Sequence, residues 1–291
     1  PNSVDSGWPK ETPPAASGGG FESYPERMEG HKVRARSPSF GDHFSQATLF
    51  WNSMSAPEKE HIIGAYSFEL GKVERVFIRE RQVNEILANI DLELARRVAE
   101  NIGVTPPTAP TMSLKQPTPA SSPALSLMNH LSGNIKSRKV AILIANGVDG
   151  DAIEAFKQKL ADEGAMAKLI GPSPAPVKTA DGKMLTPDAA MDGMPSIAFD
   201  AVFVPGGAQS VQAMAKNGVA KHYLLEAYKH LKPIAVLGEA RQLLTALNLP
   251  EDAGLITGDS GDVATVFSAF AQALSQHRVW AREAAAEQVP A

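Results

Sequence analysis

The sequence predicts an α/β protein in which an all-α segment precedes a doubly wound parallel-sheet domain. Three observations support this prediction. Apolar residues recur at helical spacing between Asp42 and Gly103, six prolines follow between Pro106 and Pro123, and continuous apolar runs alternate with helical patterns from Lys139 onward. Parallel strands carry such runs because helices cover both faces of their sheet.

The all-α segment is predicted over residues 42–104, after an extended coil over 1–41. The tetrapeptide Ser55-Ala-Pro-Glu58 is a capping box, in which the serine side chain and the glutamate side chain each bind the other's backbone amide. A second helix is predicted to carry the apolar residues between positions 76 and 90. Asp91 is expected to cap a third helix.

The prolines predict a linker over 105–137, because proline removes amide donors and disfavours helix at the preceding residue. An extended, semi-rigid connection is expected. The α/β domain is predicted over 138–282, with a tail at 283–291 and a hairpin around Ala180-Asp-Gly182. Its predicted strands are 139–145, 167–170, 201–204, 233–237 and 254–257, and its predicted helices are 151–164, 208–216, 221–230, one from 239, and 262–276.

Composition excludes several classes of protein. The 291 residues carry a net charge of −4 without any basic block, so nucleic acid is not an expected partner. The absence of cysteine excludes disulfides, thiolate catalysis and the common zinc sites, and it fits a reducing compartment. The seven histidines show no metal-ligand spacing. No apolar run is long enough to cross a membrane, and we expect a cytoplasmic protein without a bound metal.

Three loops are predicted to meet at one edge of the sheet. Ligands of open parallel sheets bind beyond the carboxyl ends of the strands, where neighbouring connections run to opposite sides. The loops expected there are 146–149, 205–207 and 238–239. The strand-to-helix turn of such folds often holds a nucleophile. Gly238 stands at this turn, where it tolerates a strained backbone but has no side chain that could attack.

Asp149 and Glu239 are the acidic candidates at this edge. Together with Gly206, Gly207 and Gly238 they form the predicted elbow pocket. The two carboxylates could pair, with one pKa raised. The interpretation that we favour is that Glu239 caps a helix N-terminus and Asp149 a turn.

The tetrapeptide Gly258-Asp-Ser-Gly261 matches the sequence around the nucleophile of chymotrypsin-like proteases. Those proteases are pairs of β-barrels, whereas this tetrapeptide follows a parallel strand and precedes a helix. Asp259 and Ser260 are therefore predicted to be ordinary helix caps.

The N-terminal part of the chain resembles large-subunit catalases. The resemblance rests on Gly20-Phe-Glu-Ser-Tyr-Pro25 and Glu29-Gly-His-Lys-Val-Arg-Ala-Arg36, which are similar to the segment after the haem barrel, and on Asp42-His-Phe-Ser-Gln-Ala-Thr-Leu-Phe-Trp51, which is similar to the first helix of the catalase helical domain. Arg79-Glu-Arg81 and Leu87-Ala-Asn-Ile-Asp91 continue it to about residue 103.

The remainder, from Lys139 to about Arg282, resembles the flavodoxin-like C-terminal domain of large-subunit catalases, which is similar to the PfpI-like and glutamine-amidotransferase group. Val204-Pro-Gly-Gly207 and His277-Arg-Val-Trp280 carry this resemblance. Active PfpI-like members have a cysteine at the elbow. The resemblance thus implies a domain that has lost its nucleophile and, by this reading, is a pseudoenzyme.

The activity that the resemblance implies is disproportionation of hydrogen peroxide by a haem, in a homotetramer that serves the oxidative stress response. This chemistry needs a distal His and Asn and a proximal Tyr in an Arg-x-x-x-Tyr helix. In the family these belong to a preceding barrel, and none of the four tyrosines here follows an arginine by four residues. We therefore expect no catalytic residue and no haem or other cofactor in this chain, whose partner would be the remainder of the catalase subunit.

Three functions remain open. The first is a role in folding, assembly, stability or channel access of the parent catalase, with the isolated chain inactive. The second is residual hydrolase or deglycase activity through Glu239 and Asp149. The third is a chaperone-like binding domain.

Overall fold

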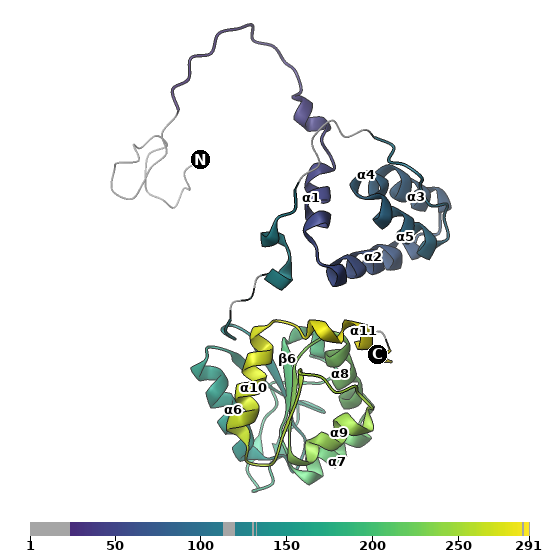
Figure 1. Ribbon diagram of the computed structural model, residues 1–291. Coiled ribbons are helices and arrows are strands. Elements are labelled where there is room, and N and C mark those ends of the chain that lie inside the picture. The colour runs from purple at the N-terminus through teal and green to yellow at the C-terminus, as the bar shows by residue number, and fades with distance from the viewer. Residues whose placement is uncertain (1–23, 113–119, 130, 132, 287, 291) are drawn as a thin grey trace. The chain divides into compact units, whose positions relative to one another are not determined.

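The computed structural model describes residues 24–112, 120–129, 131, 133–286 and 288–290. Most of the predicted N-terminal coil, at 1–23, and residues 113–119 of the predicted linker lie outside the described residues. The chain divides into a unit over 1–43 and a unit over 44–291. The second unit holds a helical segment and an α/β domain (Figure 1).

The helical segment begins at Ser45 and ends at Ile102. Its helices are α1 Ser45–Ser53, α2 Ala56–Gly71, α3 Val76–Arg81, a π-helical turn Gln82–Leu87, α4 Ala88–Ile90 and α5 Leu92–Ile102. The capping box at Ser55 is confirmed, and so is the cap of Asp91, whose side chain accepts from the amide of Leu94 at 2.9 Å. The core of the segment includes Trp51 and Leu87.

Glu58 also ties the predicted linker to the helical segment. Its buried carboxylate accepts hydrogen bonds from the amide and hydroxyl of Ser55, from the hydroxyl of Ser126 and from the amide of Leu127, each at 2.8 Å. The second half of the linker is therefore not simply extended. It forms the 3₁₀ turns Pro123–Leu125 and Leu127–Asn129 against the helices.

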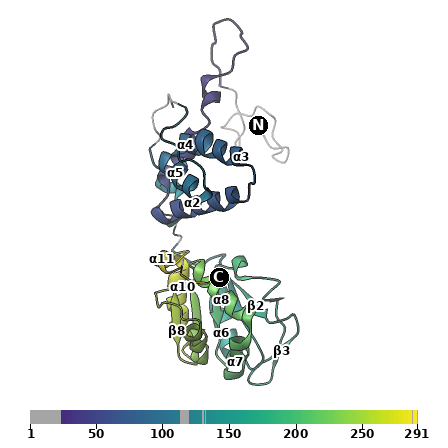
Figure 2. The same cartoon turned by 90° about the vertical axis from the view of Figure 1, so that its right-hand side faces the viewer.

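The α/β domain contains a six-stranded parallel sheet in the order β5-β2-β1-β6-β7-β8, so β2 and β8 lie toward opposite sides of it (Figure 2). In register, Val140 of β1 pairs with Ala201 of β6. The strands are β1 Lys139–Leu143, β2 Met166–Gly171, β5 Ala189–Ala190, β6 Ala201–Val204, β7 Ile234–Leu237 and β8 Leu255–Gly258, and the predicted hairpin is confirmed as β3 Val177–Lys178 with β4 Met184–Leu185. The predicted fold class is confirmed.

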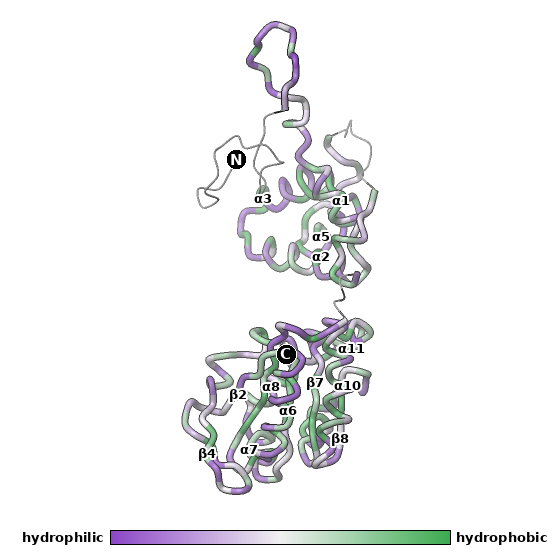
Figure 3. The backbone as a smooth tube through the Cα atoms, turned by 90° about the vertical axis from the view of Figure 1, so that its left-hand side faces the viewer, coloured by the Kyte–Doolittle hydropathy of each residue, from purple (hydrophilic) through white to green (hydrophobic). Residues whose placement is uncertain are grey.

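Helices cover both faces of the sheet. α6 and α10 pack on one face, and α7, α8 and α9 pack on the other (Figure 1). Their bounds are α6 Gly150–Asp162, α7 Ala208–Lys216, α8 Gly218–Lys229, α9 Arg241–Ala246 and α10 Val263–Ser275. The central strands are hydrophobic along their length because neither face meets water (Figure 3).

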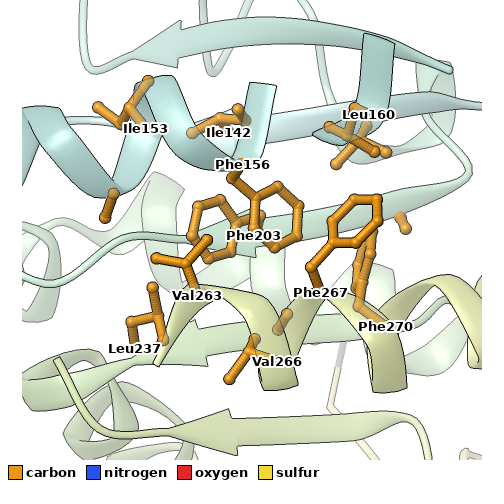
Figure 4. Packing of buried hydrophobic residues seen from close by; sticks show 14 of the residues in the cluster. Ile142, Ile153, Phe156, Leu160, Phe203, Leu237, Val263, Val266, Phe267 and Phe270 are labelled. Carbon is orange, nitrogen blue, oxygen red and sulfur yellow. The ribbon is translucent and has the colours of Figure 1, made fainter. Parts of the chain in front are cut away.

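Aromatic rings fill the face under α6 and α10. Phe156 of α6 stacks on Phe203 of β6 with ring centroids 3.8 Å apart, and Phe267 and Phe270 of α10 meet Phe156 edge-on (Figure 4). Edge-to-face and stacked aromatic pairs stabilise a fold by more than the burial of their apolar surface alone provides. This cluster holds the two helices on one side of the sheet.

The predicted tail contains further structure. A 3₁₀ turn, Trp280–Arg282, leads into α11 Glu283–Ala286. Among the described residues, no helix is long and apolar enough to span a membrane.

We predict that Glu58→Gln lowers the stability of the helical segment by about 1–3 kcal/mol. The glutamine amide nitrogen can only donate, so it cannot accept the hydrogen bonds that one carboxylate oxygen of Glu58 accepts. Burial opposes ionisation of Glu58, but its four hydrogen bonds outweigh burial and lower its pKa. This stabilisation is therefore present above the carboxyl's ordinary pKa and lost as pH falls through the lowered value.

Urea unfolding monitored by Trp51 fluorescence at pH 7 and at acid pH would test this, since Trp51 lies in the core of the same segment. The matched control is Glu60→Gln on the same helix, whose exposed pair with Arg97 contributes about 0–1 kcal/mol. An equal loss in the two variants would contradict the role of Glu58.

Candidate functional site

The three predicted loops meet at the carboxyl edge of the sheet. β1 lies between β2 and β6, so the connections that leave β1 and β6 run to opposite sides there. The amide of Asp149 donates to the carbonyl of Gly206 at 3.0 Å. The amide of Gly207 donates to Oε2 of Glu239 at 3.3 Å. The structure thus brings all five residues of the predicted elbow pocket into one place.

Gly207 is required by the closeness of these loops. Its φ is +109°, and a Cβ there would collide with the carbonyl oxygen of Gly147. Only glycine lets the loop after β6 lie this close to the loop after β1.

Gly238 has a left-handed backbone at the turn after β7. Its φ is +53°, a value that favours glycine. A Cβ at this position would overlap Oγ of Ser260, which comes from the loop after β8. The volume that a side chain at position 238 would need is therefore occupied.

The prediction that Asp259 and Ser260 are helix caps is wrong. Helix α10 begins at Val263 with Asp262 as its N-cap residue, and no side chain forms an N-cap hydrogen bond with its first backbone amides. Asp259 pairs instead with Arg241 of α9 at 3.7 Å. Ser260 packs against the elbow, a long-range contact that the local tetrapeptide does not indicate.

Asp149 and Glu239 bind backbone amides. Oδ1 of Asp149 accepts from the amide of Ala152 at 3.0 Å and caps α6, in line with the interpretation that we favoured. Glu239 differs from that interpretation, since it binds the amide of Gly207 across the loops instead of capping its own helix. Within the described part of the chain, no hydrogen bond joins the two carboxylates.

The surface beside the elbow is an open depression of about 470 Å³. Its lining is Gly238, Glu239, Arg241, Gln242, Thr245 and Ala246. It offers one exposed carboxylate, one guanidinium and the hydroxyl of Thr245, which donates to the carbonyl oxygen of Arg241 at 3.3 Å.

Three of the four described tyrosines do not fit a haem ligand, and the fourth, Tyr66, packs against the core of the helical segment. Tyr24 is 85% exposed, and the hydroxyl of Tyr228 donates to the carbonyl of Pro250 at 3.0 Å. Tyr223 is packed in the core, where burial raises its pKa, whereas a ligating phenolate needs its pKa lowered. Residues 24–112, 120–129 and the described α/β residues also contain no group of three or more His, Asp or Glu side chains that could hold a metal ion. These residues do not form a haem site.

We predict that Gly238→Ala destabilises the α/β domain by at least about 1–2 kcal/mol, the cost of a left-handed non-glycine residue, with the overlap on Ser260 added. In a Ser260→Gly background the loss should shrink, which a double-mutant cycle by urea unfolding would measure. The control is Gly218→Ala, where a Cβ meets open space. Strictly additive losses would show that Ser260 does not close the elbow.

Two family models match the chain. One is described as "Catalase-related immune-responsive" and matches residues 37–102, and the other is described as "C-terminal domain found in long catalases" and matches residues 136–284. These ranges correspond to the helical segment and the α/β domain.

Curated relatives match the chain from end to end. Catalase HPII of Pseudomonas aeruginosa is 57% identical over 100% of this chain and 40% of its own length, and Catalase HPII of Pseudomonas putida is 56% identical with the same coverage. Catalase-B of Dictyostelium discoideum is 44% identical over 100% of this chain and 42% of its own length. The chain thus spans about 40% of the length of these relatives. It belongs to the large-subunit catalase family and corresponds to the C-terminal part of an HPII-type catalase.

Proposed function

We propose that this chain is the non-catalytic C-terminal part of a haem catalase, and that it serves folding, assembly, stability or channel access in a subunit that disproportionates hydrogen peroxide. The observation that carries the proposal is the 57% identity to a catalase along the whole chain, combined with tyrosines that do not fit a haem. The haem would be held by the remainder of the subunit, where it supplies the peroxide chemistry.

Exposed aromatic residues of the helical segment support an assembly role. Phe50 is 47% exposed, Phe68 is 66% exposed and Phe77 is 58% exposed. Large apolar side chains gathered on one small segment are typical of surfaces that another protein part covers. We infer that the remainder of the subunit, or a neighbour in a homotetramer, covers them.

The elbow geometry argues against hydrolase or deglycase activity. The five residues of the elbow pocket provide no hydroxyl or thiol nucleophile, and both carboxylates are engaged: Asp149 is bound to the N-terminus of α6, and Glu239 is bound to the amide of Gly207. A side chain at position 238 would also overlap Ser260. We infer that this edge is a degenerate pocket that contributes structure.

The purified chain is expected to have no catalase turnover. Oxygen evolution from hydrogen peroxide should equal that of buffer, and added haemin should give the same Soret band with the chain as with an unrelated protein of similar mass. A complete HPII-type catalase is the positive control. Peroxide decay above the blank that co-purifies with the 30.9 kDa chain would refute the proposal.

A chaperone-like role is the second candidate, and the same exposed aromatics favour it. If it operates, the chain should suppress heat-induced light scattering of citrate synthase, and replacing Phe50, Phe68 and Phe77 by serine should abolish the suppression. Met184→Ser, at a side chain that is 62% exposed on the β3–β4 hairpin, is the control. Equal suppression by the triple variant would exclude these residues as the binding surface.

A further inference from the structure

A second hollow lies at the opposite, amino edge of the sheet, away from the elbow. There the segment after α10 crosses the loop between α8 and β7, and the amide of Val279 donates to the carbonyl of Leu231 at 2.8 Å. The lining includes Lys229, Lys232, His277, Arg278 and Trp280, and also His61, Leu127 and Ile197. Most of its basic residues come from two segments, 229–232 and 277–278, that are far apart in the sequence.

The backbone around this hollow is strained. Leu231 and His277, which line it, are non-glycine residues with φ values of +58° and +66°. The other non-glycine residues with positive φ in the described part of the chain, Ser137 and Asn248, lie outside the lining. Strain of this kind persists where the surrounding structure holds a particular geometry in place. Here it holds the two segments that line the hollow.

The acids near the hollow are paired with other basic groups. Asp200 and Glu226, which act on Lys232, pair with Arg138 at 3.4 Å and with His230 at 3.1 Å, and Glu283 pairs with His61 of the lining at 3.1 Å. Nζ of Lys232 donates to the carbonyl oxygen of Ser196 at 2.6 Å. Burial, together with the neighbouring Arg278, lowers the pKa of Lys232 to about 8.

Arg278 is likewise without a carboxylate partner among the described residues. Its guanidinium donates to the carbonyl oxygen of His277 at 2.8 Å. Burial lowers the pKa of Arg278 and outweighs the attraction of Asp200, which acts in the opposite direction. Two cations, Lys232 and Arg278, therefore stand at the hollow without a paired acid.

Two buried nitrogen atoms of the lining also lack partners. Nδ1 of His277 and Nε1 of Trp280 are buried without a hydrogen-bond partner among the described residues. The indole nitrogen can only donate, and the imidazole nitrogen donates in one tautomer or when protonated. Buried donors are nearly always satisfied in native proteins, so these atoms are suited to an acceptor that enters the hollow.

We propose that this hollow is an oxyanion site that binds a phosphate group between Arg278, His277 and Trp280. A doubly charged oxyanion would balance the two unpaired cations. Its oxygens would accept from the planar guanidinium fork and from the two unpartnered ring nitrogens. The phosphate could be free or the phosphoryl group of a small monoester, and these two sources share the same chemistry.

The test is calorimetric titration of the full 291-residue chain with inorganic phosphate, and separately with glycerol 2-phosphate, against sodium chloride at equal ionic strength. We expect saturable one-site binding and a change in fluorescence that disappears in Trp280→Phe. Tighter binding of one titrant identifies the source. In Arg278→Gln the affinity should fall about tenfold or more, because a charge-assisted contact is lost.

The matched control is Arg241→Gln, at a half-exposed arginine of the elbow edge, which should bind as the unmodified chain does. If Arg278→Gln fails to fold by circular dichroism, His277→Asn decides the question, because asparagine tolerates the left-handed backbone. Its affinity should fall severalfold. Non-saturable phosphate binding would contradict the proposed site. So would an Arg278 or His277 variant that binds phosphate as tightly as the Arg241 variant does. These outcomes are independent of catalase turnover.

Discussion

The C-terminal segment of the α/β domain depends on the buried guanidinium of Arg282. Its side chain is 0% exposed, donates to both carboxylate oxygens of Asp252 at 2.7 and 2.8 Å, and donates to the carbonyl of Lys232 at 2.8 Å. It also lies 4.0 Å over the ring of Tyr228. Burial opposes ionisation of Asp252, but Arg282 outweighs burial and lowers its pKa. Because a buried charge is costly without such partners, the segment is held in one position.

The two edges of the sheet differ in what holds their loops. At the amino edge Arg282 fixes the segment that carries His277 and Arg278, so Arg278 remains beside the hollow although it pairs with no carboxylate among the described residues. At the carboxyl edge the loops are instead closed on one another by Gly207 and Ser260. The chemistry expected from the fold is absent where parallel sheets normally bind ligands, and the unbalanced charge lies at the other edge.

Local signals predicted the fold well, and long-range contacts account for what was missed. The capping box at Ser55, the cap at Asp91 and the buried run of β1 depend on neighbouring residues, so the sequence reveals them. The five elbow residues were also predicted, because strand ends of a parallel sheet must share an edge. Two contacts join residues that are distant in the sequence: Ser260 packs against Gly238, and Ser126 donates a hydrogen bond to Glu58. Neither hydrophobic periodicity nor a capping motif predicts them.

The Gly238–Ser260 contact also explains why a nucleophile cannot be introduced at this turn by one substitution. A cysteine at position 238 would meet both a left-handed backbone and the hydroxyl of Ser260. Removing Ser260 alone creates space but supplies no side chain at position 238. Even with both changes, Glu239 would still be bound to the amide of Gly207 and Asp149 to the amide of Ala152. Both carboxylates thus satisfy backbone donors, so they stabilise the loops at this edge.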